Sequence, residues 1–135
     1  MPEEKFDGMG ISVKYLILIY SNPESREIWE GLSADERAGG LSAYTALNED
    51  LIASGEMIVT EALADPSMGK RVSVQEGRTT TTDGPFAEVK ELVAGFYLVE
   101  CESTERAIEI AARVPEAELG LVEVRPCMDL SGFLI

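Results

Sequence analysis

The sequence predicts a single α+β domain whose elements run β-α-β, β-hairpin, β-α-β, with the four main strands in one antiparallel sheet. Three observations lead to this class. Residues 15–20 and 94–101 are apolar on both alternating faces, as central strands are. Each of these runs is followed by a capped stretch whose apolar residues have helical spacing. The 135 residues also suit one domain that buries roughly two thirds of its unfolded surface.

The domain is expected over residues 14–135, after an extension over 1–13 that is polar and lacks periodicity. Its first strand covers 15–20 and ends at an Asn-Pro pair. Residues 24–30 then suit one or two helical turns, with Trp29 folded back as a cover on the core.

The first long helix is expected between Ser33, which forms a capping box with Glu36, and Gly55, which ends the helix. The adjacent glycines at 39–40 weaken its first turns and mark either a bend or a close approach of another segment. Its expected buried stripe consists of Leu41, Tyr44, Leu47, Leu51 and Ile52.

A second strand is expected over 56–62, where acidic residues and a threonine among apolar ones suit the edge of a sheet. The stretches 71–75 and 78–82 flank a Glu-Gly pair, which predicts a β-hairpin. Asp83 follows directly after this hairpin in the chain.

The third strand, 94–101, is central, and the next helix is capped by Ser103 and ends at Pro115. In the last strand, 119–125, polar and apolar residues alternate, so we expect it at an edge. The residues expected to be buried by the second long helix are Ala107, Ile108, Ala111 and Ala112.

Since the first and third strands are apolar on both faces and the other two are partly polar, the expected strand order is fourth, first, third, second. Two helices cover only one face of such a sheet. The other face keeps apolar side chains with no remaining element to cover them, which is unfavourable for a soluble monomer. We therefore expect a homodimer in which two sheets pack face to face.

Composition excludes several classes of partner. Lys and Arg number 11 against 25 Asp and Glu, a formal net charge of −14 with no basic patch, so neither nucleic acid nor an anionic membrane is expected as a partner. The longest apolar run is far shorter than a membrane span, and the first residues lack the features of a signal peptide, so we expect a cytoplasmic protein. Cys101 and Cys127 are expected to be small buried hydrophobic residues.

The chain contains no His, so it lacks both the commonest general base and the commonest metal ligand. It also has no glycine-rich phosphate loop, no paired-Cys metal spacing and no Gly-x-Ser-x-Gly turn, and we expect no metal and no cofactor. Arg125 either pairs with a carboxylate in a ligand site or is a solvent-exposed residue of the edge strand. The tyrosines are core residues with a hydrogen-bonded hydroxyl, or one or two of them line a pocket between sheet and helix: Tyr15, Tyr20, Tyr44 and Tyr97.

The most informative stretch is Asp83-Gly84-Pro85-Phe86. Asp83 suits the cap of a short helix, Gly84 a turn, Pro85 the first helical turn and Phe86 an anchor in the core. Two interpretations stay open. Asp83 is a structural cap, or it is a ligand-binding or catalytic carboxylate whose pKa is raised by apolar neighbours such as Phe86.

This stretch, continued by Ala-Glu-x-Lys-Glu, resembles the signature of the DGPF branch of the YCII-related family. Residues 14–20 are similar to the opening strand of that family, and residues 122–126 are similar to its closing strand. The resemblance covers roughly residues 14–129. It implies a ferredoxin-like domain that pairs into a dimeric α/β barrel.

The resemblance also bears on function. A His–Asp pair has been proposed as the active site in the YCII branch; Asp83 would stand for its acid, and its His falls near Tyr44. Tyrosine is a poor base near neutral pH because its unperturbed pKa is about 10, so that mechanism does not transfer intact. Proteins of the DGPF branch are often encoded beside extracytoplasmic-function sigma factors.

The function expected from sequence is a homodimer that holds a small organic molecule near Asp83. If it is an enzyme, we expect cofactor-independent lyase or isomerase chemistry, with Asp83 as acid/base and Tyr44 as a hydroxyl donor. The alternative is a non-catalytic sensor or partner of a sigma factor, since the acidic surface suits docking to a basic protein. The residues expected to contact the ligand are Tyr15, Tyr20, Phe86 and Arg125.

Overall fold

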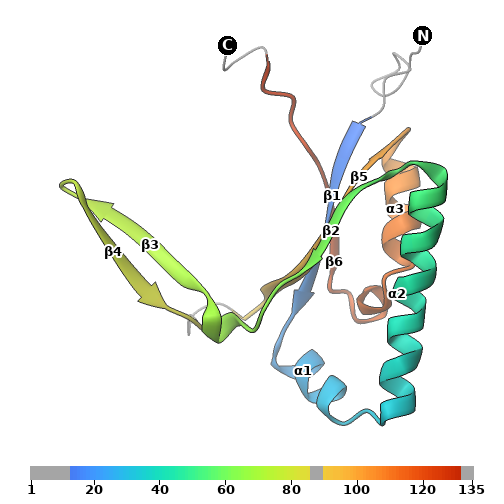
Figure 1. Cartoon of the computed structure of the whole chain (residues 1–135), viewed down its shortest axis with the longest axis horizontal. Helices are drawn as coiled ribbons and strands as arrows, with labels where there is room; N and C mark the ends of the chain where they lie inside the picture. Colours follow the sequence, from blue (N-terminus) through green and yellow to red (C-terminus); the bar gives the residue numbers. More distant parts are fainter. Residues whose placement is uncertain (1–12, 86–89, 132–135) are drawn as a thin grey trace.

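The computed structural model describes residues 13–85 and 90–131, which form a mixed α+β architecture (Figure 1). No helix in these ranges is long and apolar enough to cross a membrane. The strands are β1 (Val13–Ser21), β2 (Met57–Ala62), β3 (Lys70–Gln75), β4 (Arg78–Asp83), β5 (Leu92–Cys101) and β6 (Val122–Pro126). The α-helices are α1 (Pro23–Glu30), α2 (Ala34–Ser54) and α3 (Thr104–Ala112), and the 3-10 turns are η1 (Pro66–Met68) and η2 (Pro115–Leu119).

The four main strands form an antiparallel sheet in the order β2-β5-β1-β6, which confirms the expected order. Ile17 lies opposite Tyr97 in β5 and opposite Val124 in β6, so β1 is paired along both of its edges. The strand begins at Val13, which is buried, although the sequence places this residue in the extension.

Helices α2 and α3 lie on one face of the sheet, and the core forms between them and that face (Figure 1). Alternate residues of the central strands point into it, because side chains along a strand alternate between its two faces. The buried core residues from the sheet are Val13, Tyr15, Ile17, Ile19, Tyr97, Val99 and Cys101. Those from the helices and the turn after α3 are Leu47, Leu51, Ala107, Ile110, Ala111 and Val114.

The boundaries of α2 agree with the sequence. Ser33 and Glu36 form both hydrogen bonds of the capping box, and Gly55 ends the helix with a φ of 81°. The expected buried stripe is only partly correct, since Leu41 and Ile52 are 59% and 67% exposed. At about 100° per residue these two positions lie roughly 80–140° around the helix from the buried Leu47 and Leu51, beyond the reach of a narrow sheet.

The two glycines of α2 do not mark a close approach, because a Cβ added to Gly39 or Gly40 would meet nothing within 4 Å. In α3 the prediction is wrong for Ile108 and Ala112, which are exposed, whereas Ile110 is buried. The buried face of this short helix is therefore set by its rotation about its own axis, and the apolar residues alone do not determine that rotation.

Two further burial predictions are wrong. Trp29 is 45% exposed and does not cover the core; instead the Arg37 guanidinium lies over its ring, 5.0 Å from the centroid. Cys101 is buried as expected, but Cys127 follows β6 and is exposed. Trp29 and Cys127 both lie at the margins of the domain, where residue type alone does not say whether a side chain is buried.

Strands β3 and β4 form the expected hairpin, turning at Glu76 and Gly77, which both have positive φ. The hairpin projects from the sheet on the side opposite to α2 and α3 (Figure 1). Asp83 is the last residue of β4 and pairs in register with Lys70, and Gly84 and Pro85 do not begin the helix that Asp83 was expected to cap. Phe86, the expected anchor of that helix, lies outside the described residues.

Candidate functional site

The face of the sheet opposite the helices is apolar at its centre. Leu16 lies opposite Leu98, and Leu18 lies opposite Phe96, and all four side chains are partly exposed. Val59 of β2 extends this patch, since it pairs with Leu98 and is 37% exposed. No described helix lies over this surface (Figure 1), which we call the open face.

A polar cluster lies at the β6 side of the open face. The Tyr20 hydroxyl donates a hydrogen bond of 2.7 Å to Glu123 Oε1. Arg125 donates from Nε and Nη2 to Glu123 Oε2, at 3.0 and 2.7 Å. The pairing of β1 with β6 explains why these side chains lie together. Glu123 lies opposite Leu18 and Arg125 lies opposite Leu16, so both polar side chains are on the open face.

The cluster has a defined charge state. The hydrogen bond to Glu123 and burial raise the pKa of Tyr20, with a further contribution from the charge of Glu91. Hydrogen bonds from Tyr20 and then from Arg125 lower the pKa of Glu123. At neutral pH the cluster therefore consists of a neutral phenol, a carboxylate and a guanidinium, whose formal charges cancel.

Asp83 lies at the base of the hairpin. Its side chain is 75% exposed and accepts a bond of 2.7 Å from Lys70 Nζ. The chain that follows Asp83 returns to the sheet at Leu92, which pairs with Ser21, the residue next to Tyr20. The base of the hairpin thus connects to the end of the sheet that carries the polar cluster.

Tyr44 lies on the helix side of the sheet, and the structure does not bring it together with Asp83. Its hydroxyl donates to Glu116 in η2, and its ring stacks on Tyr97 with centroids 6.5 Å apart. Burial and the bond to Glu116 raise the pKa of Tyr44. Tyr97 donates in turn to Asn48, so this group holds α2 and η2 on the sheet.

Tyr15 is also on the helix side. It is buried, and its hydroxyl lies 3.0 Å from Thr104 Oγ1 at the start of α3. Of the residues expected to contact a ligand, the structure brings together Tyr20 and Arg125, and it places Tyr15 elsewhere. Phe86 lies outside the described residues.

The residue that joins Tyr20 to Arg125 is Glu123, which sequence analysis left out of the site. An acidic residue on an edge strand is usually a solvated one. The available signal was its spacing of two from Arg125, which places both side chains on one face of β6.

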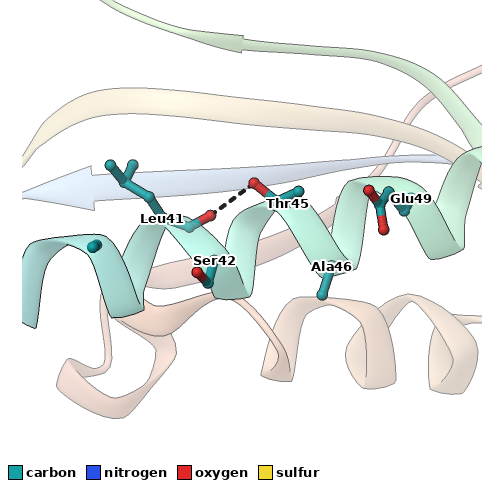
Figure 2. Close-up of a pocket in the computed structure, with 6 residues that line it drawn as sticks. Leu41, Ser42, Thr45, Ala46 and Glu49 are labelled. Carbon is teal, nitrogen blue, oxygen red and sulfur yellow. Dashed lines mark hydrogen bonds between the residues drawn. The ribbon is translucent and has the colours of Figure 1, made fainter. Parts of the chain in front are cut away.

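A shallow hollow lies on the outer surface of α2, away from these residues (Figure 2). Its wall comes from one helix, and the Thr45 hydroxyl there donates to the carbonyl of Leu41 at 3.0 Å. Glu49 is the single titratable group among its lining residues. Within residues 13–85 and 90–131, no group of three or more Cys, Asp or Glu side chains is arranged to hold a metal ion.

The comparison with protein families covers the same part of the chain. The model of the YCII-related domain matches residues 13–131, a range that includes every strand and helix named above. The chain belongs to the YCII-related domain family. An uncharacterized protein of Rhizobium meliloti (strain 1021) is similar to this YCII-related chain, with 30% identity over 114 residues that cover 83% of the chain and 90% of the relative.

Proposed function

We propose that this YCII-related chain forms a homodimer that holds a small organic molecule at the Tyr20 end of the open face, near Asp83. The observation that carries the proposal is the cluster of Tyr20, Glu123 and Arg125 beside an apolar surface without a cover in the described chain. Ligand sites commonly combine an apolar wall with a few converging polar groups. The Asp-Gly-Pro-Phe signature supports placing the chain in the DGPF branch.

The homodimer is supported by the open face itself. Leu16, Leu18, Phe96 and Leu98 present a continuous apolar surface at the centre of the sheet, and such surfaces are usually covered in soluble proteins. A second copy of the same sheet offers an equally apolar cover, and stacked sheets pack about 10 Å apart. This arrangement, a dimeric α/β barrel built from two ferredoxin-like domains, places the polar cluster of each copy at the margin of the buried space.

The chemistry of the site suits a small polar molecule with both donors and acceptors. Arg125 and Tyr20 are donors, Glu123 is an acceptor, and Asp83 supplies a carboxylate for proton transfer. We propose cofactor-independent lyase or isomerase chemistry with Asp83 as acid/base. The role of hydroxyl donor passes from Tyr44 to Tyr20, because Tyr44 donates to Glu116 on the other side of the sheet.

A non-catalytic role is the second candidate. The side chain of Asp83 is 75% exposed, and the formal net charge of −14 suits docking to a basic protein. In this alternative the protein acts as a sensor or partner of an extracytoplasmic-function sigma factor. The ligand, if any, would then change the affinity for that partner without being converted.

The proposed ligand site and the homodimer are tested by native mass spectrometry of protein purified from its own host, beside Asp83→Asn and Asp50→Asn variants. Asp50 is a matched control, since it is 64% exposed and pairs with Arg113 at 2.8 Å, much as Asp83 pairs with Lys70. We expect a dimer with a bound molecule that only the Asp83→Asn variant loses.

Other outcomes are equally informative. A ligand retained by Asp83→Asn removes Asp83 from the site, and a monomer at micromolar concentration overturns the homodimer. A dimer that is empty in all three proteins favours the sensor, and capture of a sigma factor by the purified protein is then the next measurement.

A further inference from the structure

The β3–β4 hairpin extends away from the sheet, and every residue of its two strands is exposed (Figure 1). Its ladder pairs Val72 with Thr81 and Val74 with Thr79. A two-stranded hairpin is at best marginally stable alone in water. A hairpin of this length therefore gains stability from packing against another surface.

The two faces of the hairpin differ in character. Val72, Val74, Thr79 and Thr81 share one face, and the two valines are 61% and 66% exposed. The other face is polar: Arg71, Ser73, Gln75, Arg78, Thr80 and Thr82. Since β-branched side chains are favoured in strands where they pack against a partner, the valine face is the one suited to a contact.

The charge of the hairpin is opposite to that of the rest of the chain. Residues 70–83 hold three basic side chains (Lys70, Arg71, Arg78) and two acidic ones (Glu76, Asp83), a formal charge of +1. The whole chain has a formal charge of −14, so the rest carries −15. A second copy of this chain is therefore acidic, and a hairpin of net positive charge is not repelled by it as another acidic segment would be.

The hairpin is also long enough to reach across a second copy. Strands of six residues extend about 20 Å at 3.3 Å per residue. A four-stranded sheet is only about 15 Å wide at 4.8 Å between strands. The hairpin projects on the side of the open face, where a second sheet would lie (Figure 1).

We propose that the β3–β4 hairpin is an arm that clasps a second copy of this chain through its valine face. The proposal rests on the homodimer of the proposed function and adds a contact beyond the two open faces. Because Asp83 is the last residue of β4, docking of the arm also fixes the position of this carboxylate. Dimerisation and ligand binding are then coupled through the arm.

The test compares Val72→Lys/Val74→Lys with Ser73→Lys/Thr80→Lys in the full chain. Both double variants add the same charge to the hairpin, one pair on the valine face within β3 and the other on the polar face, across β3 and β4. Analytical ultracentrifugation measures the dimer dissociation constant. We expect the valine-face variant to weaken the dimer at least about tenfold, as buried lysines do, and the polar-face variant to change it less than about twofold.

A second measurement covers the case in which the lysines unfold the hairpin. A photo-crosslinking benzophenone amino acid replaces Val74 or, as the control, Thr80, and irradiated protein is separated by mass. We expect covalent dimers from position 74 and few from position 80.

A wild-type dimer that is unaffected by the valine-face lysines and gives no crosslink at position 74 overturns the arm and leaves the homodimer intact. A monomeric wild-type protein overturns both, so the two failures are distinguishable.

Discussion

The Tyr20 hydroxyl donates a 2.7 Å hydrogen bond to Glu123, a residue 103 positions further along the chain. The bond ties the end of β1 to β6, and Arg125 holds the second carboxylate oxygen of the same residue. The donors and the acceptor are thus positioned by strand pairing before any ligand arrives. Such positioning reduces the entropy that binding would otherwise cost.

Replacing Tyr20 with Phe removes the phenol donor and leaves the Glu123–Arg125 pair in place. If the ligand contacts this cluster, we expect its affinity to fall about tenfold, the usual effect of losing one hydrogen bond to a charged group. The measurement is isothermal titration with the molecule found by native mass spectrometry. Tyr15→Phe is the control, because that hydroxyl contacts Thr104 on the helix side, and a similar loss there would contradict a specific role for Tyr20.

Acid stability is expected to depend on Glu56. Arg106 donates to both of its carboxylate oxygens, at 2.9 and 2.8 Å, and these bonds, with one from Ser54, lower the pKa of Glu56. A lowered folded-state pKa stabilises the fold above the ordinary glutamate pKa, and this contribution is lost as the pH falls through the lowered value. We expect Glu56→Gln to reduce the free energy of unfolding at pH 7 by about 1–2 kcal/mol and to flatten its decline below about pH 4.5.

Urea unfolding at pH 7, 5 and 3 measures this effect. Glu109→Gln is the control, because Glu109 also pairs with Arg106 but is 68% exposed. A parallel decline in wild type and Glu56→Gln would show that other carboxylates control acid unfolding.

Much of the fold follows from sequence because its signals are local. The capping box of Ser33 and Glu36, the positive φ of Gly55 and the apolar alternation of β1 and β5 each depend on residues close together in the chain. Burial depends on distant partners instead. The spacing of Leu41 and Ile52 is helical, but no local signal says that the sheet reaches only Leu47 and Leu51.

The two faces of α2 provide a direct test. Leu47 is fully buried, and we expect Leu47→Ala to lower the free energy of unfolding by about 2–5 kcal/mol through the cavity that it leaves. Leu41 is 59% exposed, and Leu41→Ala is expected to change the free energy of unfolding by less than about 0.5 kcal/mol. Urea unfolding of both variants decides between the observed burial and the wider stripe suggested by helical spacing.

Alanine substitutions at two glycines of this region are expected to change the stability of the protein in opposite directions. Gly55 has a φ of 81°, so Gly55→Ala strains the backbone and destabilises the protein by about 1 kcal/mol. Gly39 is helical with open space around it, and Gly39→Ala is expected to stabilise by roughly 0.5–1 kcal/mol. Thermal unfolding of the two variants should give melting temperatures on either side of the wild type; the same sign for both would contradict the described conformations.

The candidate site is less accessible to sequence analysis than the fold. Tyr20 and Arg125 are proposed from residue type alone, but their connection through Glu123 depends on the register between β1 and β6, which come from opposite ends of the chain. At Asp83 a local sequence signal is overridden by strand pairing. Asp before Gly-Pro suits a helix cap, yet the ladder with β3 extends one residue further than expected and takes Asp83 into β4.

The strand order also determines when the sheet assembles during synthesis. Each pairing in the sheet involves β5 or β6, since β1 and β2 are not neighbours. A nascent chain that ends before Leu92 therefore contains no two strands of the sheet that pair with each other, although α2 and the hairpin are already complete. Until then the apolar residues of β1 emerge from the ribosome unpaired, and this is the interval in which chaperones protect such segments from aggregation.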